Sequence, residues 1–248
     1  MSFTVDTVEE NNTLNNLLYL ESLIDHCPVI TQDFTETLSP YQALQLLKEG
    51  NARFVEDNSE DINSSSKRVY QLSDGQNPFA TVFSCSDSRD SCPNVFNRGL
   101  GDIFEVSTAG ETLYDNTSTT NISLQTVQSI EYAVSALSCP LLVIMGHTDC
   151  GALKHAYPYW EENTDPAPST DDFYMLTNSL KNACKDPTSS NYDEAALNQT
   201  IDVKTYLSDP NNSKIISEAL VTGNFAIEVA MYDVHTGIVT FGEMQTNI

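Results

Sequence analysis

Two short segments of this sequence carry side chains that could bind one metal ion. The first, "FSCSDSRD", places Cys85, Asp87 and Arg89 at alternate positions directly after an apolar run. The second, "MGHTDCGAL", contains His147 and, three residues later, Cys150. Together the two cysteines and the histidine offer two thiolates and an imidazole, a set that favours zinc over magnesium or calcium.

Three protein ligands leave one position of a tetrahedral zinc ion open, which is typical of a catalytic rather than a structural site. On an extended stretch, residues 85, 87 and 89 point to the same side, so Asp87 could reach the ion or a water molecule beside it. Arg89 could then bind the Asp87 carboxylate with two hydrogen bonds. Taken singly, these motifs have ordinary interpretations, such as a buried thiol or a surface ion pair.

The elements that must position these residues alternate between strands and helices. Apolar runs and helix-capping signals predict strands over 79–84, 103–107 and 140–146, helices over 39–50 and 123–137, and a strand, turn and returning strand within 224–242. The two cysteine-bearing segments then follow strands at their carboxyl ends, where open α/β sheets build their sites.

The predicted fold class is α/β, with a mostly parallel central β-sheet flanked by helices. We expect residues 39–248 to form a single zinc-binding catalytic domain. Residues 1–38 would form an N-terminal helical arm whose apolar patch "LLYLESLI" needs another surface to cover it. Residues 161–200 are predicted to be less regular, with "EENTDPAPST" and "KDPTSSNYDE" as surface loops.

Composition excludes several classes of protein. The 248 residues include 35 acidic and 11 basic side chains, a net charge of −24, so the general field disfavours nucleic acid and anionic membranes. The longest apolar run, Leu141 to Met145, is too short to span a bilayer. The N-terminus shows no secretory signal, and six irregularly spaced cysteines favour reduced thiols. These features predict a cytoplasmic protein, with an organelle not excluded.

The motif "CSDSR" followed by "GHTDCGA" resembles the β-class carbonic anhydrases, whose zinc motif is Cys-x-Asp-x-Arg with His-x-x-Cys. "LKEGNARF", "RGLGDIFEV", "SIEYAV" and "AMYDVHTGIV" are also similar to family segments, in family order, over roughly residues 41–243. The resemblance implies Zn²⁺ bound by Cys85, His147 and Cys150, with Asp87 and Arg89 as a catalytic dyad. It implies reversible hydration of carbon dioxide to bicarbonate and a proton.

The resemblance also implies a substrate pocket and a partner. Family pocket positions fall on Gln76, Phe104, Ala109, Tyr132 and Gly151. In the family some of these come from the neighbouring subunit, which implies a homodimer or a higher even homo-oligomer. The family also has a closed form, in which the residue equivalent to Asp87 is the fourth zinc ligand.

The chain departs from the family pattern close to the implied site. Asp90 stands where an apolar residue is usual, Ser107 and Thr108 replace an Arg-Asn pair, and Glu111 replaces an asparagine. Two other functions therefore stay open: a related zinc hydrolase acting on carbonyl sulfide or carbon disulfide, and a non-catalytic zinc-bearing structural subunit. The intact dyad argues against the latter, whereas the substituted "STAGE" segment favours it.

Overall fold

The structure is a computed structural model that describes residues 38–59, 63–113, 123–183 and 191–245, without the side chains of residues 175 and 181–183. All but the last residue of the predicted N-terminal arm therefore lies outside the described residues. Within the described part, no helix is long and apolar enough to cross a membrane.

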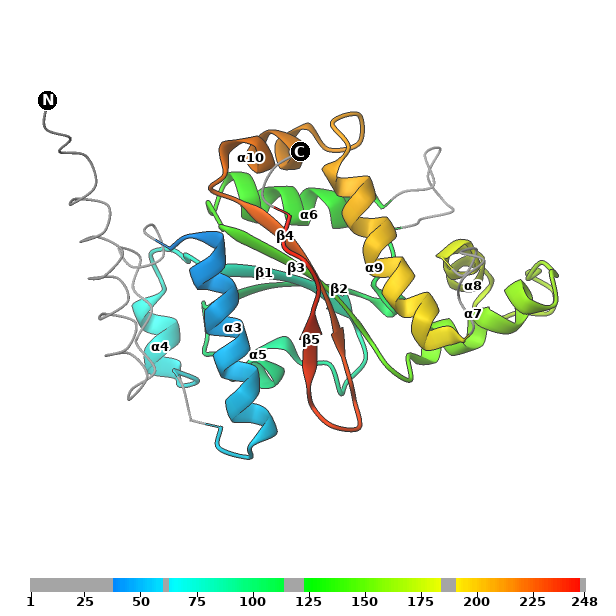
Figure 1. The fold of residues 1–248 in the computed structure, drawn as a ribbon, viewed down its shortest axis with the longest axis horizontal. Helices are drawn as coiled ribbons and strands as arrows, with labels where there is room; N and C mark the ends of the chain where they lie inside the picture. The colour runs from blue at the N-terminus through cyan, green and yellow to red at the C-terminus, as the bar shows by residue number, and fades with distance from the viewer. Residues whose placement is uncertain (1–37, 60–62, 114–122, 184–190, 246–248) are drawn as a thin grey trace, which may run out of the picture. The chain divides into compact units, whose positions relative to one another are not determined.

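The centre of the fold is a five-stranded β-sheet in the order β2-β1-β3-β4-β5 (Figure 1). Its strands are β1 (Ala80–Cys85), β2 (Ile103–Thr108), β3 (Leu141–His147), β4 (Ala226–Tyr232) and β5 (Val239–Phe241). The first four run parallel to one another, and β5 is antiparallel to β4. The predicted α/β class with a mostly parallel sheet is confirmed.

Helices connect and flank these strands. They are α3 (Pro40–Val55), α4 (Ser66–Gln71), α5 (Cys92–Val95), α6 (Leu124–Ser135), α7 (Gly151–Glu161), α8 (Tyr174–Ala183), α9 (Tyr192–Ser208) and α10 (Lys214–Thr222), with a 3₁₀ turn η1 at Ala109–Glu111. The strands predicted from apolar runs agree with β1, β2 and β3 to within one residue at each end.

Helix α3 begins as predicted but ends later. Ser39 caps it: its hydroxyl accepts from the Gln42 amide at 3.3 Å, and the Gln42 side chain accepts from the Ser39 amide at 2.9 Å. Gly50, predicted as the stop, lies inside the helix. A side chain is not tolerated there, because a Cβ would lie 1.7 Å from the Phe96 carbonyl oxygen. This glycine serves close packing rather than termination.

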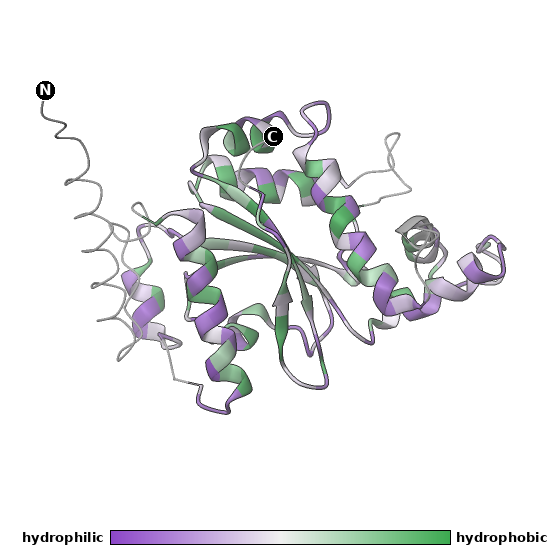
Figure 2. Ribbon diagram, viewed as in Figure 1, coloured by the Kyte–Doolittle hydropathy of each residue, from purple (hydrophilic) through white to green (hydrophobic). Residues whose placement is uncertain are grey.

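The core lies between the sheet and the helices. Much of the central sheet is coloured as hydrophobic in Figure 2, and every residue of β1 and β3 is buried. One buried cluster joins strand residues to side chains of α6, α9 and α10: Phe83, Leu142, Ile144 and Ile227 with Val127, Ile130, Val134, Val203, Leu207, Ile216 and Leu220. Burial of apolar surface stabilises the fold by roughly 25 cal/mol per Å². This packing holds the ends of the strands in fixed positions relative to one another.

Of the two loops predicted within residues 161–200, the first agrees with the structure from residue 162 onwards, where α7 has ended. In the second, residues 185–190 lie outside the described residues, and residues 192–194 are wrongly predicted because they begin α9.

The range as a whole is more regular than expected. Helix α8 and the first half of α9 lie there, and α9 buries Gln199 and Thr200 together with Ala195 and Ala196. Small and polar side chains on the buried face leave little apolar periodicity to recognise. Packing against β3, β4 and α7, rather than a sequence pattern, identifies this helix.

Candidate metal centre

Three buried side chains meet at the carboxyl ends of β1 and β3. Cys85 is the last residue of β1 and His147 the last of β3, and Cys150 is the N-cap of α7. Because Ser84 pairs with Met145, the parallel register brings the two strand ends together. The ligand atoms all lie within 4.8 Å of one another, and the two sulfur atoms are 4.0 Å apart. The predicted ligand set is thus assembled within one chain.

The histidine presents one nitrogen atom to this cluster. Its Nδ1 lies 2.8 Å from the Thr148 carbonyl oxygen, an acceptor, so Nδ1 carries the proton and donates it. Its Nε2 is buried and, in the described part of the chain, has no hydrogen-bond partner. A buried lone pair without a donor is costly, and a bound cation would satisfy it.

The two thiols form a coupled pair. A thiol hydrogen bond from Cys150 and the Gly110 amide, 3.2 Å from the Cys85 sulfur, lower the pKa of Cys85 to about 4, although burial opposes the shift. The hydrogen bond that the Cys150 thiol donates to the Cys85 thiolate raises the pKa of Cys150, and burial and the repulsion between two neighbouring negative charges add to the shift. A divalent cation would remove that repulsion and favour both thiolates, and the donor set of two sulfurs and one imidazole nitrogen fits zinc.

Asp87 and Arg89 form the bidentate pair that the sequence predicts, but not on an extended stretch. The chain turns after β1, and the Asp90 amide donates to the Asp87 carbonyl at 2.9 Å. Arg89 Nε and Nη2 still reach the two carboxylate oxygens at 2.9 and 2.7 Å. These hydrogen bonds hold the pKa of Asp87 well below its usual range, although partial burial opposes the shift. Asp87 is therefore ionised at neutral pH.

Asp149, between the two ligands of the second segment, is a residue that the sequence analysis missed. Its backbone is in the left-handed region at φ 55°, and its amide donates to Asp193 Oδ1 at 2.8 Å. Its carbonyl accepts from Arg89 Nη2 at 3.1 Å. Tyr192 donates its hydroxyl proton to the carboxylate at 3.1 Å, and His235 Nε2 lies 3.3 Å from it. Nothing in "HTDC" itself signals these distant partners.

The five predicted pocket residues divide into two groups. Ala109 precedes Gly110, which contacts Cys85, and Gly151 follows Cys150, so both are next to the cluster in the chain. The other three are distant.

Phe104 pairs with Thr81 in the β1–β2 register, whereas Cys85 pairs with Thr108. Four residues of strand separate the two positions, roughly 13 Å. The Tyr132 ring lies 6.2 Å from the Phe104 ring, and Gln76 is exposed in the loop before β1.

The acidic departures from the family pattern are partly buried beside the site. Asp90 and Glu111 are buried, and their carboxylate oxygens have no partner among the described residues. Burial raises the pKa of Asp90 to about 7 and that of Glu111 well above its usual value, and negative charge at Cys85 adds to both. Ser107 is exposed and Thr108 half-buried. The sequence-based expectation of a more acidic site therefore applies to Asp90 and Glu111.

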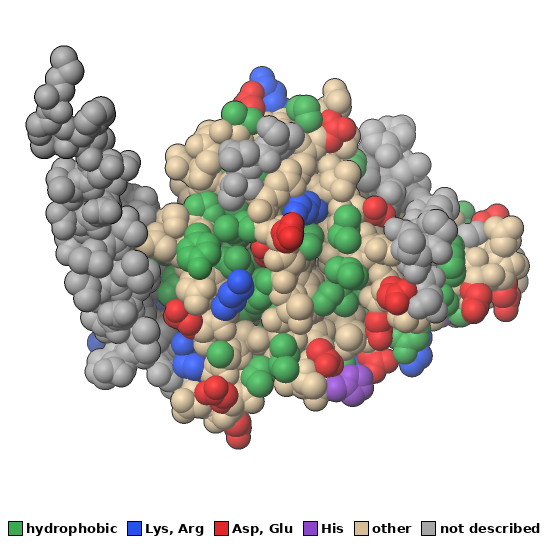
Figure 3. Space-filling view, in the orientation of Figure 1, with side chains coloured by type: hydrophobic (Ala, Val, Ile, Leu, Met, Phe, Trp, Pro, Cys, Tyr) green, Lys and Arg blue, Asp and Glu red, His purple; other side chains and the backbone are tan. Residues whose placement is uncertain are grey.

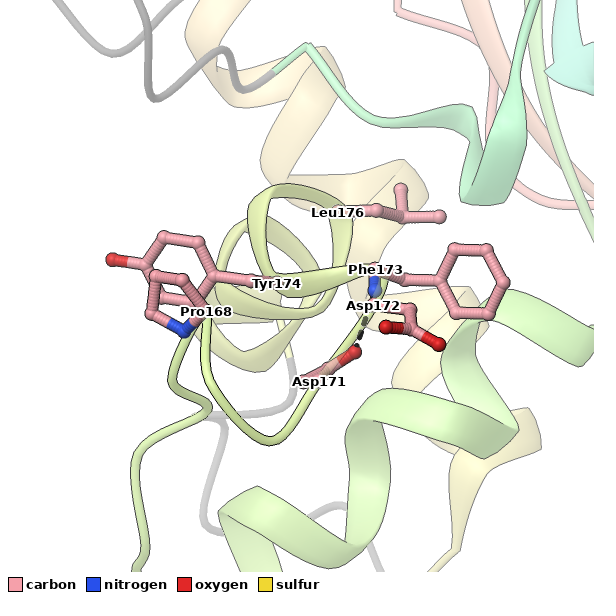
Figure 4. A pocket seen from close by; sticks show the side chains of 6 residues that line it. All are labelled: Pro168, Asp171, Asp172, Phe173, Tyr174 and Leu176. Atoms are coloured by element: carbon pink, nitrogen blue, oxygen red, sulfur yellow. Dashed lines mark hydrogen bonds between the residues drawn. The ribbon is translucent and has the colours of Figure 1, made fainter.

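A hollow on the surface lies apart from the metal cluster. A cavity of about 590 Å³ next to the start of α8 is lined by Pro168, Asp171, Asp172, Phe173, Tyr174 and Leu176 (Figure 4). None of these belongs to the metal cluster, and Asp171 is engaged by His155 Nε2 at 3.2 Å and by the Phe173 amide at 2.7 Å.

On the face shown in Figure 3, acidic side chains are scattered among polar and apolar ones.

Comparison with known proteins identifies the family. Residues 80–239, more than half of the chain, match the family model described as carbonic anhydrase. The chain belongs to the β-class carbonic anhydrase family. It is 39% identical over 128 residues to carbonic anhydrase 2 of Mycobacterium tuberculosis and 40% identical over 129 residues to a carbonic anhydrase of Mycolicibacterium smegmatis. Each match covers 52% of this chain and 58% of the length of the mycobacterial protein.

Solved structures agree on the fold. The β-carbonic anhydrase CcaA is similar with a TM-score of 0.55 and 24% identity, covering 81% of this chain and 95% of that one. Tetrameric β-carbonic anhydrases from Sordaria macrospora are similar with a TM-score of 0.56 and 20% identity, covering 71% and 86%. At such identities the likeness establishes the shared α/β fold.

Proposed function

We propose that this protein is a zinc-dependent carbonic anhydrase that hydrates carbon dioxide reversibly to bicarbonate and a proton. The observation that carries the proposal is the convergence of three buried ligand atoms beside an ionised carboxylate that Arg89 holds in a bidentate grip. Membership of the carbonic anhydrase family supports the reaction type. Three protein ligands also leave one zinc position open, which is typical of catalytic sites rather than structural ones.

Each residue then has a defined task. Cys85, His147 Nε2 and Cys150 would hold Zn²⁺, which supplies a Lewis acid able to bring the pKa of water towards about 7 in favourable sites. Asp87, ionised because of Arg89, accepts a hydrogen bond from the reacting water and orients its lone pair towards the carbon atom. Both Asp87 oxygens are engaged by Arg89, which favours the open form over the closed one in which Asp87 would bind the metal.

The charges of the ligands predict the pH dependence. Two thiolates and a neutral imidazole cancel the +2 charge of zinc, so this set acidifies water less than three neutral histidines would. Since the pKa of Asp87 lies far below neutrality, loss of activity at low pH comes from the water and not from Asp87. Activity should therefore rise with pH through a point near or above neutrality.

A second copy of the chain would complete the pocket. Phe104 lies about 13 Å along the strand from the metal cluster of its own chain. The Tyr132 ring is 6.2 Å from the Phe104 ring, and half of the Tyr132 surface is exposed. In a homodimer or a higher even oligomer, these rings and Gln76 would wall the metal centre of the neighbouring copy. The tetrameric assembly of the Sordaria macrospora proteins is consistent with this proposal.

Stopped-flow measurement of carbon dioxide hydration by zinc-loaded protein, with elemental analysis, tests the function. We expect one zinc per chain and a kcat/KM that increases between about pH 6 and pH 9. A flat profile in zinc-replete protein would contradict the mechanism. Stoichiometric zinc without hydration would favour the structural function, and turnover of carbonyl sulfide but not of carbon dioxide would favour the hydrolase.

A further inference from the structure

The turn that links two metal ligands is held by a helix from outside the motif. Between His147 and Cys150, Asp149 has a φ of 55°. Non-glycine residues adopt this left-handed conformation at a cost, although aspartate tolerates it better than most. A turn of this kind keeps its shape only if surrounding contacts determine it.

Those contacts come from the first turn of α9, a segment to which the sequence assigned no role. Asp193 Oδ1 accepts the Asp149 amide proton at 2.8 Å, and the Tyr192 hydroxyl donates to the Asp149 carboxylate at 3.1 Å. Asn191 fixes Asp193 in turn, because its side chain accepts from the Asp193 amide at 3.0 Å. The Tyr192 ring lies 5.5 Å from Lys154 Nζ of α7, which joins the two helices.

The same turn also positions the dyad. The Asp149 carbonyl accepts from Arg89 Nη2 at 3.1 Å, while that nitrogen atom donates to Asp87 at 2.7 Å. A shift of Asp149 would therefore move both the ligand pair and the guanidinium group that orients Asp87. Hydrogen-bond partners outside a ligand set commonly control metal affinity in this way.

We propose that Asp193 and Tyr192 are positioning residues of the metal centre, which clamp the His147–Cys150 turn in its ligating conformation and hold Arg89 in register with Asp87. Without the clamp, Asp149 relaxes towards an ordinary conformation and the geometry of the two ligands loosens. The inference rests on the proposed zinc centre, but it concerns how firmly the ion is held and not which reaction follows.

The test is the rate at which zinc leaves the folded protein. Zinc-loaded wild type and variants are mixed with excess chelator at 25 °C, and release is followed with a colorimetric zinc indicator. Asp193→Ala should release zinc about tenfold faster, at the lower end of the range for supporting hydrogen-bond partners. Asp193→Asn keeps an acceptor oxygen and should restore a release rate close to that of the wild type. Tyr192→Phe should accelerate release roughly two- to threefold.

Glu194→Ala is the matched control, because it removes an acidic side chain from the same first turn of α9. Equal acceleration by Glu194→Ala and Asp193→Ala would overturn the clamp in favour of a general helix effect, and so would release from Asp193→Ala at the wild-type rate. A purely structural contact would lower the unfolding temperature of Asp193→Ala without changing zinc release, which also counts against the proposal. If Asp193→Ala does not fold, Tyr192→Phe decides: faster release supports the clamp and an unchanged rate overturns it.

Zinc binding by the wild type without carbon dioxide hydration would contradict the proposed activity, while the release rates would still decide the clamp. Hydration by the wild type with unaltered release in every variant would contradict the clamp alone.

Discussion

The metal cluster and the Phe104–Tyr132 pair lie towards opposite ends of the parallel strands of the sheet. The cluster lies at the carboxyl ends of β1 and β3 and is buried, with every ligand atom supplied by one chain. The aromatic pair lies near the amino end of β2 and on α6, where Tyr132 is 50% exposed. The three candidate ligands all come from one chain, whereas the aromatic pair packs partly against the core and leaves half of Tyr132 exposed.

This difference separates two requirements of the proposed enzyme. Metal binding needs only the strand ends and the start of α7, which the core fixes within one chain. A walled pocket needs rings that one chain places too far from its own metal centre. Substitutions in the two regions should therefore have different consequences for zinc content and for turnover.

The largest effect is expected from Cys150→Ser. Loss of one thiolate from the ligand set should reduce zinc affinity by more than ~100-fold, beyond the range for residues outside the set, and should abolish hydration. Elemental analysis after extensive dialysis measures the loss. Cys139→Ser is the control: it also removes a buried thiol, but Cys139 lies outside the cluster, so zinc content should stay unchanged. Full zinc content and turnover in Cys150→Ser would contradict the proposed metal centre.

Asp87→Asn should separate turnover from metal binding. The amide cannot accept the same charged hydrogen bonds, so kcat should fall by about 100-fold or more, within the range for general acid–base groups. Zinc content should remain stoichiometric, since both Asp87 oxygens are engaged by Arg89. Stopped-flow kinetics beside zinc analysis provide the measurement. Loss of zinc from this variant would indicate that Asp87 is a ligand, as in the closed form.

Phe104→Ala probes the aromatic region. Removal of the ring should lower kcat/KM about tenfold, the lower end of the range for groups that shape a metal site, while each chain still binds zinc. Mixing Phe104→Ala with Cys150→Ser gives the sharper experiment. In a mixed dimer the metal centre of the first variant would meet the intact ring of the second, so activity should exceed that of either variant alone. No recovery after subunit exchange has been verified would argue that the pocket is built within one chain.

The smallest effect concerns stability rather than catalysis. Burial raises the pKa of Asp90 from 3.8 to about 7, so the folded protein favours the protonated carboxyl group. The wild type therefore loses stability as pH rises from about 4 to about 7, where the buried group must ionise. In zinc-free protein, Asp90→Asn should be more stable than the wild type at pH 8 by on the order of 2–4 kcal/mol, and the difference should vanish near pH 4. Urea denaturation measures this, with the exposed Asp172→Asn as the control. An equal destabilisation at every pH would instead show that the Asp90 carboxylate makes a structural hydrogen bond.

Much of the fold and the ligand set was predictable from local patterns. The continuous apolar runs over 79–84 and 140–146 predict buried strands because only a sheet covered on both faces accommodates them. Ser39 and Ser123 mark the starts of α3 and α6, because a serine side chain satisfies the free amides there. Placing Cys85 and His147 at neighbouring strand ends then follows from the geometry of parallel sheets.

Other features left no local signal. A glycine such as Gly50 is a usual signal for the end of a helix, but here it permits close packing against the Phe96 carbonyl. Helix α9 buries Gln199 and Thr200, so its buried face could not be distinguished from a polar loop. Asp149 is separated in the sequence by 44 residues from Asp193 and by 60 residues from Arg89. At such separations a local sequence pattern carries no information about contact.

By itself, the sequence determined which donor atoms are available and, through hydrophobic periodicity, which ends of which strands carry them. Tertiary structure alone decided that the three candidate ligand atoms lie within 4.8 Å of one another and that the two thiols interact. It also decided that the first turn of α9 contacts the turn between His147 and Cys150. The reason is physical: burial patterns are local and repeat with the backbone, whereas the contacts that fix an ion and orient a carboxylate form only when distant segments pack together.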